Sequence, residues 1–192
     1  ELFSLANRYI SVVEETGNDD GVLKATEYIG NLYMNSPEEQ ERELVKSSYK
    51  RWSEIKDIPN ENYAKILALD KQYLDASRVY EEIAYKRINN DTLKYRASYI
   101  YFKSIICQLC EGDMIAAVNK QNEYKQAFGM YEGSRECRLL DKIIPACQDN
   151  NVDDFVFNLR EYDQVSKIDD FLVELLNKVK KNLNQDDPNS LR

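Results

Sequence analysis

Residues 166–183 carry the pattern that decides the fold of this chain, and they read SKIDDFLVELLNKVKKNL. Apolar side chains recur there at the helical spacings i, i+3, i+4, i+7, i+8, i+11 and i+15, which places them on one stripe of an α-helix. They are Ile168, Phe171, Leu172, Leu175, Leu176, Val179 and Leu183. Ser166 followed by Asp169 fits a capping box, so a helix is expected over residues 167–184.

The helical period continues through the rest of the chain. Ser36 and Pro37 form a second start signal, because a cap, a proline at the first helical position and following acids all favour a helix N-terminus. Only six glycines and four prolines occur in 192 residues, so turns are few. No segment alternates with a period of two, so no strand is expected. Helices are expected near residues 1–16, 21–35, 37–56, 61–71, 73–87, 92–111, 114–128, 134–148, 151–162 and 167–184.

Repetition indicates how these helices stack. Tyr73, Ala76 and Tyr80 are spaced as in the second helix of a tetratricopeptide unit, where a small alanine lets a partner helix approach and a tyrosine wedges between neighbours. Related helix starts recur at Gly112 and Asn151, at a step of roughly 40 residues. The pattern favours antiparallel helix pairs that lie side by side. Ordinary helical packing without a true repeat stays an alternative.

Composition excludes several classes of function. The chain has no histidine, which excludes Ser-His-Asp and Cys-His catalysis and His-ligated zinc. A net charge of −8 argues against binding to nucleic acid, and no apolar run approaches the about 20 residues of a membrane-spanning helix. Glycine-rich nucleotide motifs are missing, and the neighbouring Asp153 and Asp154 cannot face each other as an acid–base couple. We therefore expect no enzymatic activity, no cofactor and no metal site.

The four cysteines are Cys107, Cys110, Cys137 and Cys147. Cys107 and Cys110 form a C-x-x-C, a spacing found in redox sites and in half of some metal sites. Here the pair lies in an apolar helical stretch without the preceding strand or turn of a thioredoxin-type motif. Because free cysteine is among the most buried residue types, we expect four free thiols, with this pair in the core.

Charge is unevenly distributed along the chain. Residues 86–103 hold five cations and one acid, a net charge of +4, whereas residues 141–170 hold eight acids and three cations, a net charge of −5. Two interpretations stay open at this point. Both segments could be solvated faces, or the molecule could hold an acidic partner at its centre and a basic partner near its C-terminus.

From about Asn62 onward, the chain resembles the soluble NSF attachment proteins, and the alpha type most closely. The matching blocks occur in family order with near-family spacing. They are residues 71–82 (KQYLDASRVYEE), 93–95 (LKY), 101–103 (YFK), 107–110 (CQLC), 134–137 (SREC), 151–153 (NVD), 161–163 (EYD), 180–181 (KK) and 191–192 (LR). Residues 1–61 match only in helical character.

The resemblance implies an all-α fold, a tetratricopeptide-like superhelix of antiparallel helix pairs that ends in a C-terminal helical bundle. The repeat layer is expected over residues 1–133, the bundle over 134–184, and a flexible acidic tail ending in Leu-Arg over 185–192. Family members extend further at the N-terminus, where a loop attaches to the membrane surface. That part is expected to be missing here, as in an N-terminally truncated chain.

The implied function is that of an adaptor in vesicle trafficking and membrane fusion. In the family, several copies wrap a SNARE four-helix bundle, recruit the hexameric ATPase NSF and stimulate its ATP hydrolysis, so that the bundle is disassembled. Such adaptors are cytoplasmic and peripherally associated with membranes. A generic tetratricopeptide-type peptide-binding scaffold and a gamma-type attachment protein are the alternatives.

The resemblance also implies a set of site residues. Arg135 matches a basic position that the family turns toward the SNARE bundle. A second such position, a lysine in the family, is Ser98 here, and the nearby Arg96 and Lys103 are expected to replace it. Leu191 matches the penultimate leucine through which the family stimulates ATP hydrolysis. Each also has a plain structural interpretation, because an exposed arginine is usually just solvated and a terminal leucine usually frays.

The acidic positions that the family turns toward NSF are matched only in part. Two of them hold Pro145 and Gln148 here, which makes the expected interface thinner than usual. The adjacent pair of acids after Asn151 is expected to compensate. The expected NSF-binding residues are Asp113, Asp149, Asp153 and Asp154.

Overall fold

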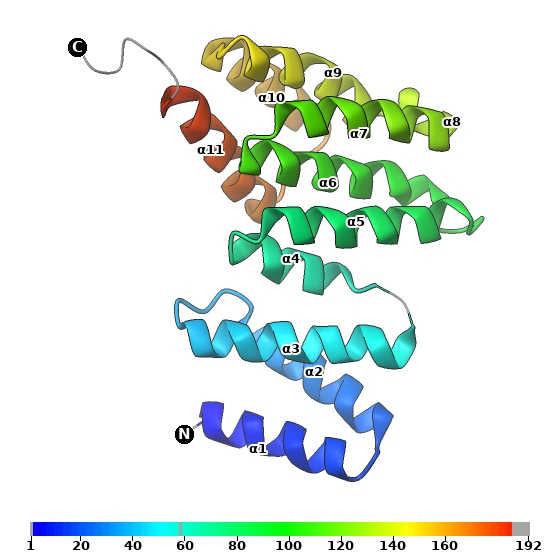
Figure 1. The fold of residues 1–192 in the computed structure, drawn as a ribbon, viewed down its shortest axis with the longest axis vertical. Helices are drawn as coiled ribbons and strands as arrows, with labels where there is room; N and C mark the ends of the chain where they lie inside the picture. The colour runs from blue at the N-terminus through cyan, green and yellow to red at the C-terminus, as the bar shows by residue number, and fades with distance from the viewer. Residues whose placement is uncertain (1, 58, 186–192) are drawn as a thin grey trace. The chain divides into compact units, whose positions relative to one another are not determined.

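A computed structural model describes residues 2–57 and 59–185 of the chain. Within these ranges the regular structure consists of eleven α-helices and one 3₁₀ helix, without a strand (Figure 1), which confirms the all-α class. The elements are α1 (Leu2–Glu15), α2 (Asp19–Tyr33), α3 (Glu39–Lys56), α4 (Glu61–Leu69), α5 (Tyr73–Ile88), η1 (Lys94–Arg96), α6 (Ala97–Glu111), α7 (Met114–Ala127), α8 (Gly129–Glu132), α9 (Arg135–Gln148), α10 (Val152–Val165) and α11 (Asp170–Gln185).

Four of the expected helix starts differ from the structure by two residues or more: α2 begins at Asp19 instead of residue 21, α3 at Glu39 instead of 37, α6 at Ala97 instead of 92, and α11 at Asp170 instead of 167. The N-terminus of α11 is capped by Asp169, whose Oδ1 accepts a hydrogen bond from the backbone N–H of Leu172 at 2.8 Å, and Ser166 instead ends α10. Helix α3 begins at Glu39, so Pro37 precedes the helix rather than occupying its first position. The short helix α8 was not expected from the sequence either.

The chain divides into two compact units, an N-terminal unit of residues 1–79 and a C-terminal unit of residues 80–192. The boundary falls inside α5. The expected division between residues 133 and 134 lies within the C-terminal unit, where α8 packs against α9. The expected tail was to begin at residue 185, but Gln185 is the last residue of α11, and residues 186–192 lie outside the described residues.

In the N-terminal unit, α2 packs between α1 and α3, and α3 packs against α4. Their apolar faces meet in one cluster, as the helical spacing of apolar residues requires. The buried members are Ala6, Ile29, Tyr33, Met34, Leu44, Val45, Tyr49 and Ile66. Gly30 lets the ring of Tyr49 approach the backbone of α2 closely, because a Cβ at this position would lie 2.7 Å from Tyr49 Cζ.

We therefore expect Gly30→Ala to destabilise the N-terminal unit by about 1–3 kcal/mol, the usual cost of overpacking a core. Trp52, the only tryptophan of the chain, lies on α3 and reports unfolding of this unit by its fluorescence in urea. The control is Gly129→Ala, where the added Cβ meets nothing within 4 Å. Equal urea midpoints for Gly30→Ala and the unchanged chain would show that Tyr49 moves aside without cost.

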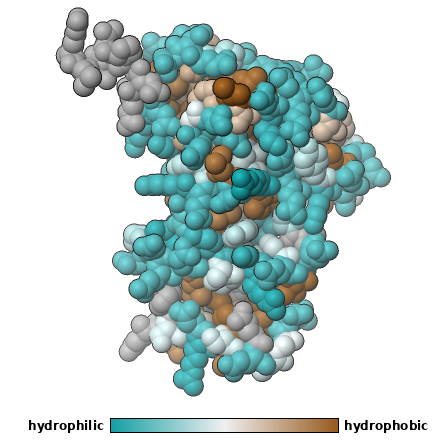
Figure 2. Space-filling model, viewed as in Figure 1, coloured by the Kyte–Doolittle hydropathy of each residue, from teal (hydrophilic) through white to brown (hydrophobic). Residues whose placement is uncertain are grey.

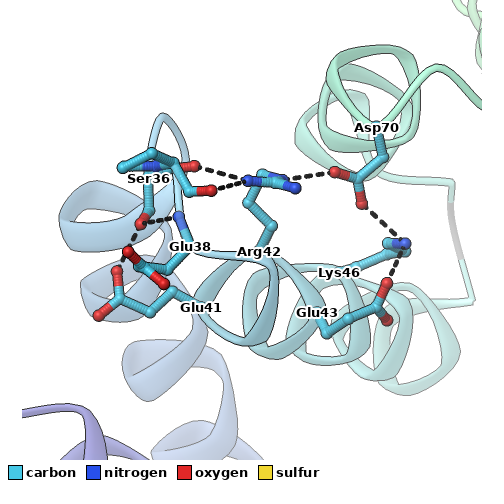
Figure 3. A network of polar contacts seen from close by, with 8 residues as sticks. Ser36, Glu38, Glu41, Arg42, Glu43, Lys46 and Asp70 are labelled. Atoms are coloured by element: carbon cyan, nitrogen blue, oxygen red, sulfur yellow. Dashed lines mark hydrogen bonds and ion pairs between the residues drawn. The ribbon is translucent and has the colours of Figure 1, made fainter.

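An ionic network joins α3 to the segment that follows α2 and to the end of α4 (Figure 3). Arg42 Nε donates to Asp70 Oδ1 at 2.6 Å, and Lys46 Nζ lies 2.8 Å from Asp70 Oδ2. The Arg42 guanidinium also donates to the carbonyl oxygens of Ser36 and Pro37. Asp70 follows the last residue of α4, where the helix dipole disfavours an acid. Arg42 and Lys46 therefore stabilise the Asp70 carboxylate, which the dipole of α4 disfavours.

The network predicts an acid-sensitive N-terminal unit. Burial alone would raise the pKa of Asp70, but the hydrogen bonds and charges of Lys46 and Arg42 outweigh it and hold the pKa below its ordinary value. A carboxyl with a depressed pKa stabilises the fold above its unfolded-state pKa of about 3.9, and that contribution is lost as the pH falls through the folded-state pKa. Asp70→Asn should thus lower the free energy of unfolding of the N-terminal unit by about 1–3 kcal/mol near neutral pH. It should also remove the part of the acid destabilisation below about pH 4 that comes from Asp70.

Trp52 fluorescence in urea, measured from pH 7 to pH 3, checks this expectation. Asp75→Asn is the matched control, since the carboxylate of Asp75 is 59% exposed and pairs with the exposed Arg78. A pH profile for Asp70→Asn parallel to that of the unchanged chain would contradict the assignment of acid sensitivity to Asp70.

Helix α6 forms the centre of the C-terminal unit. Residues Ala97–Cys110 of this helix are buried apart from Tyr99, and α6 packs against α7, α9 and α11. The ring of Tyr101 stacks on Tyr124 with centroids 3.9 Å apart, and Tyr131 meets both rings edge-on. The apolar stripe of residues 168–183 lies on α11 and is buried from Phe171 to Leu183. Only its first member, Ile168, precedes the helix.

All four cysteines are free, and Cys107 and Cys110 are buried, as expected; Cys137 and Cys147 are buried as well. Burial raises the pKa of Cys110 and of Cys147 to about 12, and it raises that of Cys107 well above the ordinary range. These thiols are therefore protonated at neutral pH and pack as small apolar side chains.

Candidate partner-binding surfaces

Cations mark the starts of two helices in the C-terminal unit. Arg96 is the last residue before α6, and Arg135 is the first residue of α9; both are exposed. The N-terminal end of a helix carries partial positive charge, so acids stabilise it and cations do not. The first turn of α6 contains no acid at all. Arg135 therefore does not stabilise its own helix, which favours a role in contacting another molecule. Arg96 is also the last residue of η1, at a helix end where a cation is favoured.

The local sequence of α9 turns its cations outward. Ser134 caps the helix, because its Oγ accepts a hydrogen bond from the backbone N–H of Cys137 at 3.1 Å. The helix then buries Cys137, Leu140 and Ile144 against the core of the unit. Arg135 therefore lies on the outer side. Two further cations that sequence reasoning missed, Arg138 and Lys142, are exposed on the same helix. Their spacing of three and seven residues from Arg135 was the available signal.

Lys103 does not lie on this surface. Its residue is only 7% exposed, and its Nζ lies 4.8 Å from the centroid of the Tyr99 ring and within about 6 Å of the rings of Tyr80 and Phe171. Ser98, which stands where the family has a lysine, is buried as well. Of the two residues expected to replace that lysine, Arg96 is therefore the one that presents its charge to solvent.

The expected acidic residues gather at two hairpin turns. Asp113 caps α7 by accepting from the backbone N–H of Ala116 at 2.8 Å. Asp149 follows α9, where the negative end of the helix dipole disfavours it. Asp154, in the first turn of α10, accepts a hydrogen bond from the side-chain amide of Asn151 at 2.7 Å.

Asp113 and Asp154 thus have local structural roles. The carboxylates of Asp149 and Asp153 are exposed and are held by no contact within the described part of the chain. These two acids therefore stand open to a partner of opposite charge.

The two sets of charges lie at opposite edges of the C-terminal unit. Helices α6 and α7 run antiparallel, as do α9 and α10, so helix starts and hairpin turns alternate between two edges (Figure 1). The starts of α6 and α9 with Arg96 and Arg135 share one edge, and the α6–α7 and α9–α10 turns share the other. Helix α6 has 15 residues, so the edges are about 22 Å apart.

The surface between these edges is mainly hydrophilic. Figure 2 shows hydrophobic atoms only in small, separate patches on the visible face. Arg135 borders a shallow groove of about 280 Å³ between α9 and α10. A larger groove of about 770 Å³ lies between α10 and α11, and none of the expected site residues lines it. Recognition at the expected positions therefore rests mostly on charge.

Membrane-spanning helices and metal clusters are both absent from residues 2–57 and 59–185. No helix in these ranges has both the length and the apolar character to cross a bilayer. Nor do the same ranges bring three metal-ligating side chains together. Leu191, the residue expected to stimulate ATP hydrolysis, lies outside the described residues.

Comparisons with known proteins agree on one family. The family described as soluble NSF attachment protein, SNAP, matches residues 56–184, about two thirds of the chain. The alpha-soluble NSF attachment protein of Homo sapiens is 33% identical over 120 residues, which cover 62% of this chain and 40% of that protein. The beta-soluble NSF attachment protein of Bos taurus is 24% identical over 193 residues, 97% of this chain and 64% of that protein.

A fungal relative extends the same pattern. The vesicular-fusion protein SEC17 of Komagataella phaffii is 29% identical over 135 residues, 68% of this chain and 46% of that protein. The matched part of the chain thus spans less than half the length of the human and fungal relatives. With the all-α fold and the ordered sequence blocks, these matches lead to one conclusion: the chain belongs to the soluble NSF attachment protein family.

Proposed function

We propose that this chain is an adaptor in intracellular vesicle trafficking and membrane fusion. It binds assembled SNARE complexes, recruits the ATPase NSF and stimulates ATP hydrolysis by NSF, so that the SNARE complexes are taken apart. Membership of the family supports this role. The observation within the chain that carries the proposal is the separation of charge in the C-terminal unit, with Arg96 and Arg135 at one edge and the acidic turns at the other.

This separation suits a molecule that holds two partners at once. A SNARE four-helix bundle is a long acidic rod, which the cationic edge attracts. The acidic turns with Asp113, Asp149 and Asp153 attract the basic N-terminal domains of NSF. Because the edges are about 22 Å apart, one partner does not cover the binding surface of the other. Like charge also keeps each partner away from the wrong edge.

The role needs no catalytic group in this chain, since the chemical step belongs to NSF. The adaptor contributes binding energy and orientation. Leu191 adds an apolar contact that shifts NSF toward its hydrolysing state. In the cell, this function places the chain in the cytoplasm, peripherally associated with membranes.

The proposal is tested by the affinity of the purified 192-residue chain for a SNARE complex. Fluorescence anisotropy compares the assembled four-helix bundle with the separate SNARE helices before assembly. Binding to the assembled bundle is expected, and it should weaken as salt rises, because exposed charges more than about 8 Å apart are largely screened at physiological ionic strength. Equal binding to bundle and separate helices would instead point to a generic peptide-binding scaffold.

A further inference from the structure

We infer that Arg138 and Lys142 extend the SNARE-contacting surface beyond Arg135, so that one face of α9 binds an acidic helix of the bundle over two helical turns. This inference rests on the proposed function and deepens it. Together, Arg135, Arg138 and Lys142 form the α9 cationic face.

The α9 cationic face is regularly spaced. Its members stand at i, i+3 and i+7, which places their side chains one above another along the helix. At 1.5 Å per residue, they span about 10 Å along the axis. An acidic helix that runs alongside α9 can present acids on one of its faces at positions i, i+3 or i+4, and i+7, which cover the same length. One face of α9 therefore matches two turns of an acidic helix.

These cations have no carboxylate partner of their own among the described residues. Arg138 Nη2 donates to the carbonyl oxygen of Gly133 at 3.0 Å, a contact that leaves the charge uncompensated. Glu136, the acid in the first turn of α9, instead accepts a hydrogen bond from the hydroxyl of Tyr162 at 3.0 Å. No ion pair within the described ranges involves Arg135 or Lys142.

Some cations elsewhere in the described part of the chain do have a carboxylate partner. The chain holds 34 acids and 26 cations, so carboxylates are plentiful. Lys125 of α7, for example, pairs with Asp141 of α9 at 2.7 Å. Other cations with a carboxylate within 4 Å are Arg42, Lys46, Arg51, Arg78, Lys86, Lys94, Lys120 and Lys167. Three exposed cations left together on one face are therefore available for an acidic partner.

A groove lies beside this face. The α9 cationic face forms one wall of the shallow groove of about 280 Å³, and Tyr162 and Val165 of α10 contribute to the other. Val165 is 67% exposed, which offers an apolar contact to a partner helix. Glu161 also borders the groove on the α10 side. An acidic helix is therefore attracted to the α9 side and repelled from the α10 side, which orients it along α9.

The test is the affinity of charge-reversal variants for the assembled SNARE bundle at low salt. Arg138→Glu combined with Lys142→Glu should weaken binding by about tenfold, because two attractive contacts of an exposed type become repulsive. The matched control combines Arg160→Glu with Lys180→Glu, which changes the charge equally but lies at the α10–α11 groove. The control should change the affinity by less than about twofold. The neutral variant Arg138→Gln with Lys142→Gln should lose an amount of affinity between those of the charge reversal and the control. Because it introduces no new charge, it checks that a loss does not come from misfolding.

The outcomes separate this inference from the proposed function. A tenfold loss confined to the α9 variant supports the inference. Equal binding by the α9 variant and the unchanged chain overturns the inference and leaves the proposed function standing. Equal losses for the α9 variant and the control overturn it as well, since only net charge would then matter. An unchanged chain that does not bind the bundle overturns the proposed function.

Discussion

Arg135→Glu is expected to weaken capture of an assembled SNARE bundle by about five- to tenfold at low salt, with the fold intact. Arg135 is exposed at the first position of α9, and no carboxylate of the described chain compensates its charge. An exposed ion pair is worth about 0.2–1 kcal/mol, and reversing the charge replaces that attraction with a repulsion of similar size. Because the N-terminus of α9 favours an acid, the substitution should leave the helix at least as stable.

Binding of Arg135→Glu to an immobilised bundle at several salt concentrations checks this expectation. Arg160→Glu is the matched control, an exposed arginine on α10 that borders a different groove. The defect of Arg135→Glu should shrink as salt rises, because screening weakens both attraction and repulsion. Capture by Arg135→Glu equal to that by Arg160→Glu at low salt would mean that Arg135 is only a solvated charge.

Leu191→Ala should keep SNARE binding and most recruitment of NSF but lose most of the stimulation of ATP hydrolysis. Burying one leucine side chain on a partner is worth about 1.5–3 kcal/mol, and part of that is lost to ordering the segment that carries it. This is too little to hold a complex together. It is nevertheless enough to shift a conformational equilibrium of the ATPase by about tenfold, since each 1.4 kcal/mol corresponds to that factor.

The steady-state rate of ATP hydrolysis by NSF at saturating adaptor and bundle measures this effect. Ser190→Ala is the matched control, a change in the neighbouring residue of the same segment. Equal rates for Leu191→Ala and Ser190→Ala would remove the role of Leu191. A parallel loss of NSF recruitment by Leu191→Ala would make Leu191 an anchor rather than a switch.

The helices were predictable from the sequence because their buried faces are periodic. The stripe from Phe171 to Leu183 is buried on α11, and Cys107 and Cys110 are buried on α6, as the apolar context indicated. Helix starts were less predictable. Ser166 and Asp169 are both good caps, and which of them caps α11 depends on the packing of that helix rather than on local sequence.

The candidate site was predictable only in outline. Arg96, Arg135 and the acids at the turns are exposed, as a surface role requires. Lys103 was expected among them because it lies near Ser98, which stands where the family has a lysine. In the fold, α6 is surrounded by other helices, and the rings of Tyr80, Tyr99 and Phe171 receive the ammonium group. Tyr99 precedes Lys103 by four residues on α6, but Tyr80 and Phe171 come from α5 and α11, so no local pattern could reveal the whole contact.

The central claim is that this chain links a SNARE bundle to NSF. The most direct measurement is the retention of NSF, with a non-hydrolysable ATP analogue, on an immobilised SNARE bundle in the presence and absence of the purified chain. We predict that NSF is retained only when the chain is present, in proportion to the amount of chain on the bundle. Retention of NSF that does not depend on the chain, or a chain on the bundle that holds no NSF, would contradict this claim.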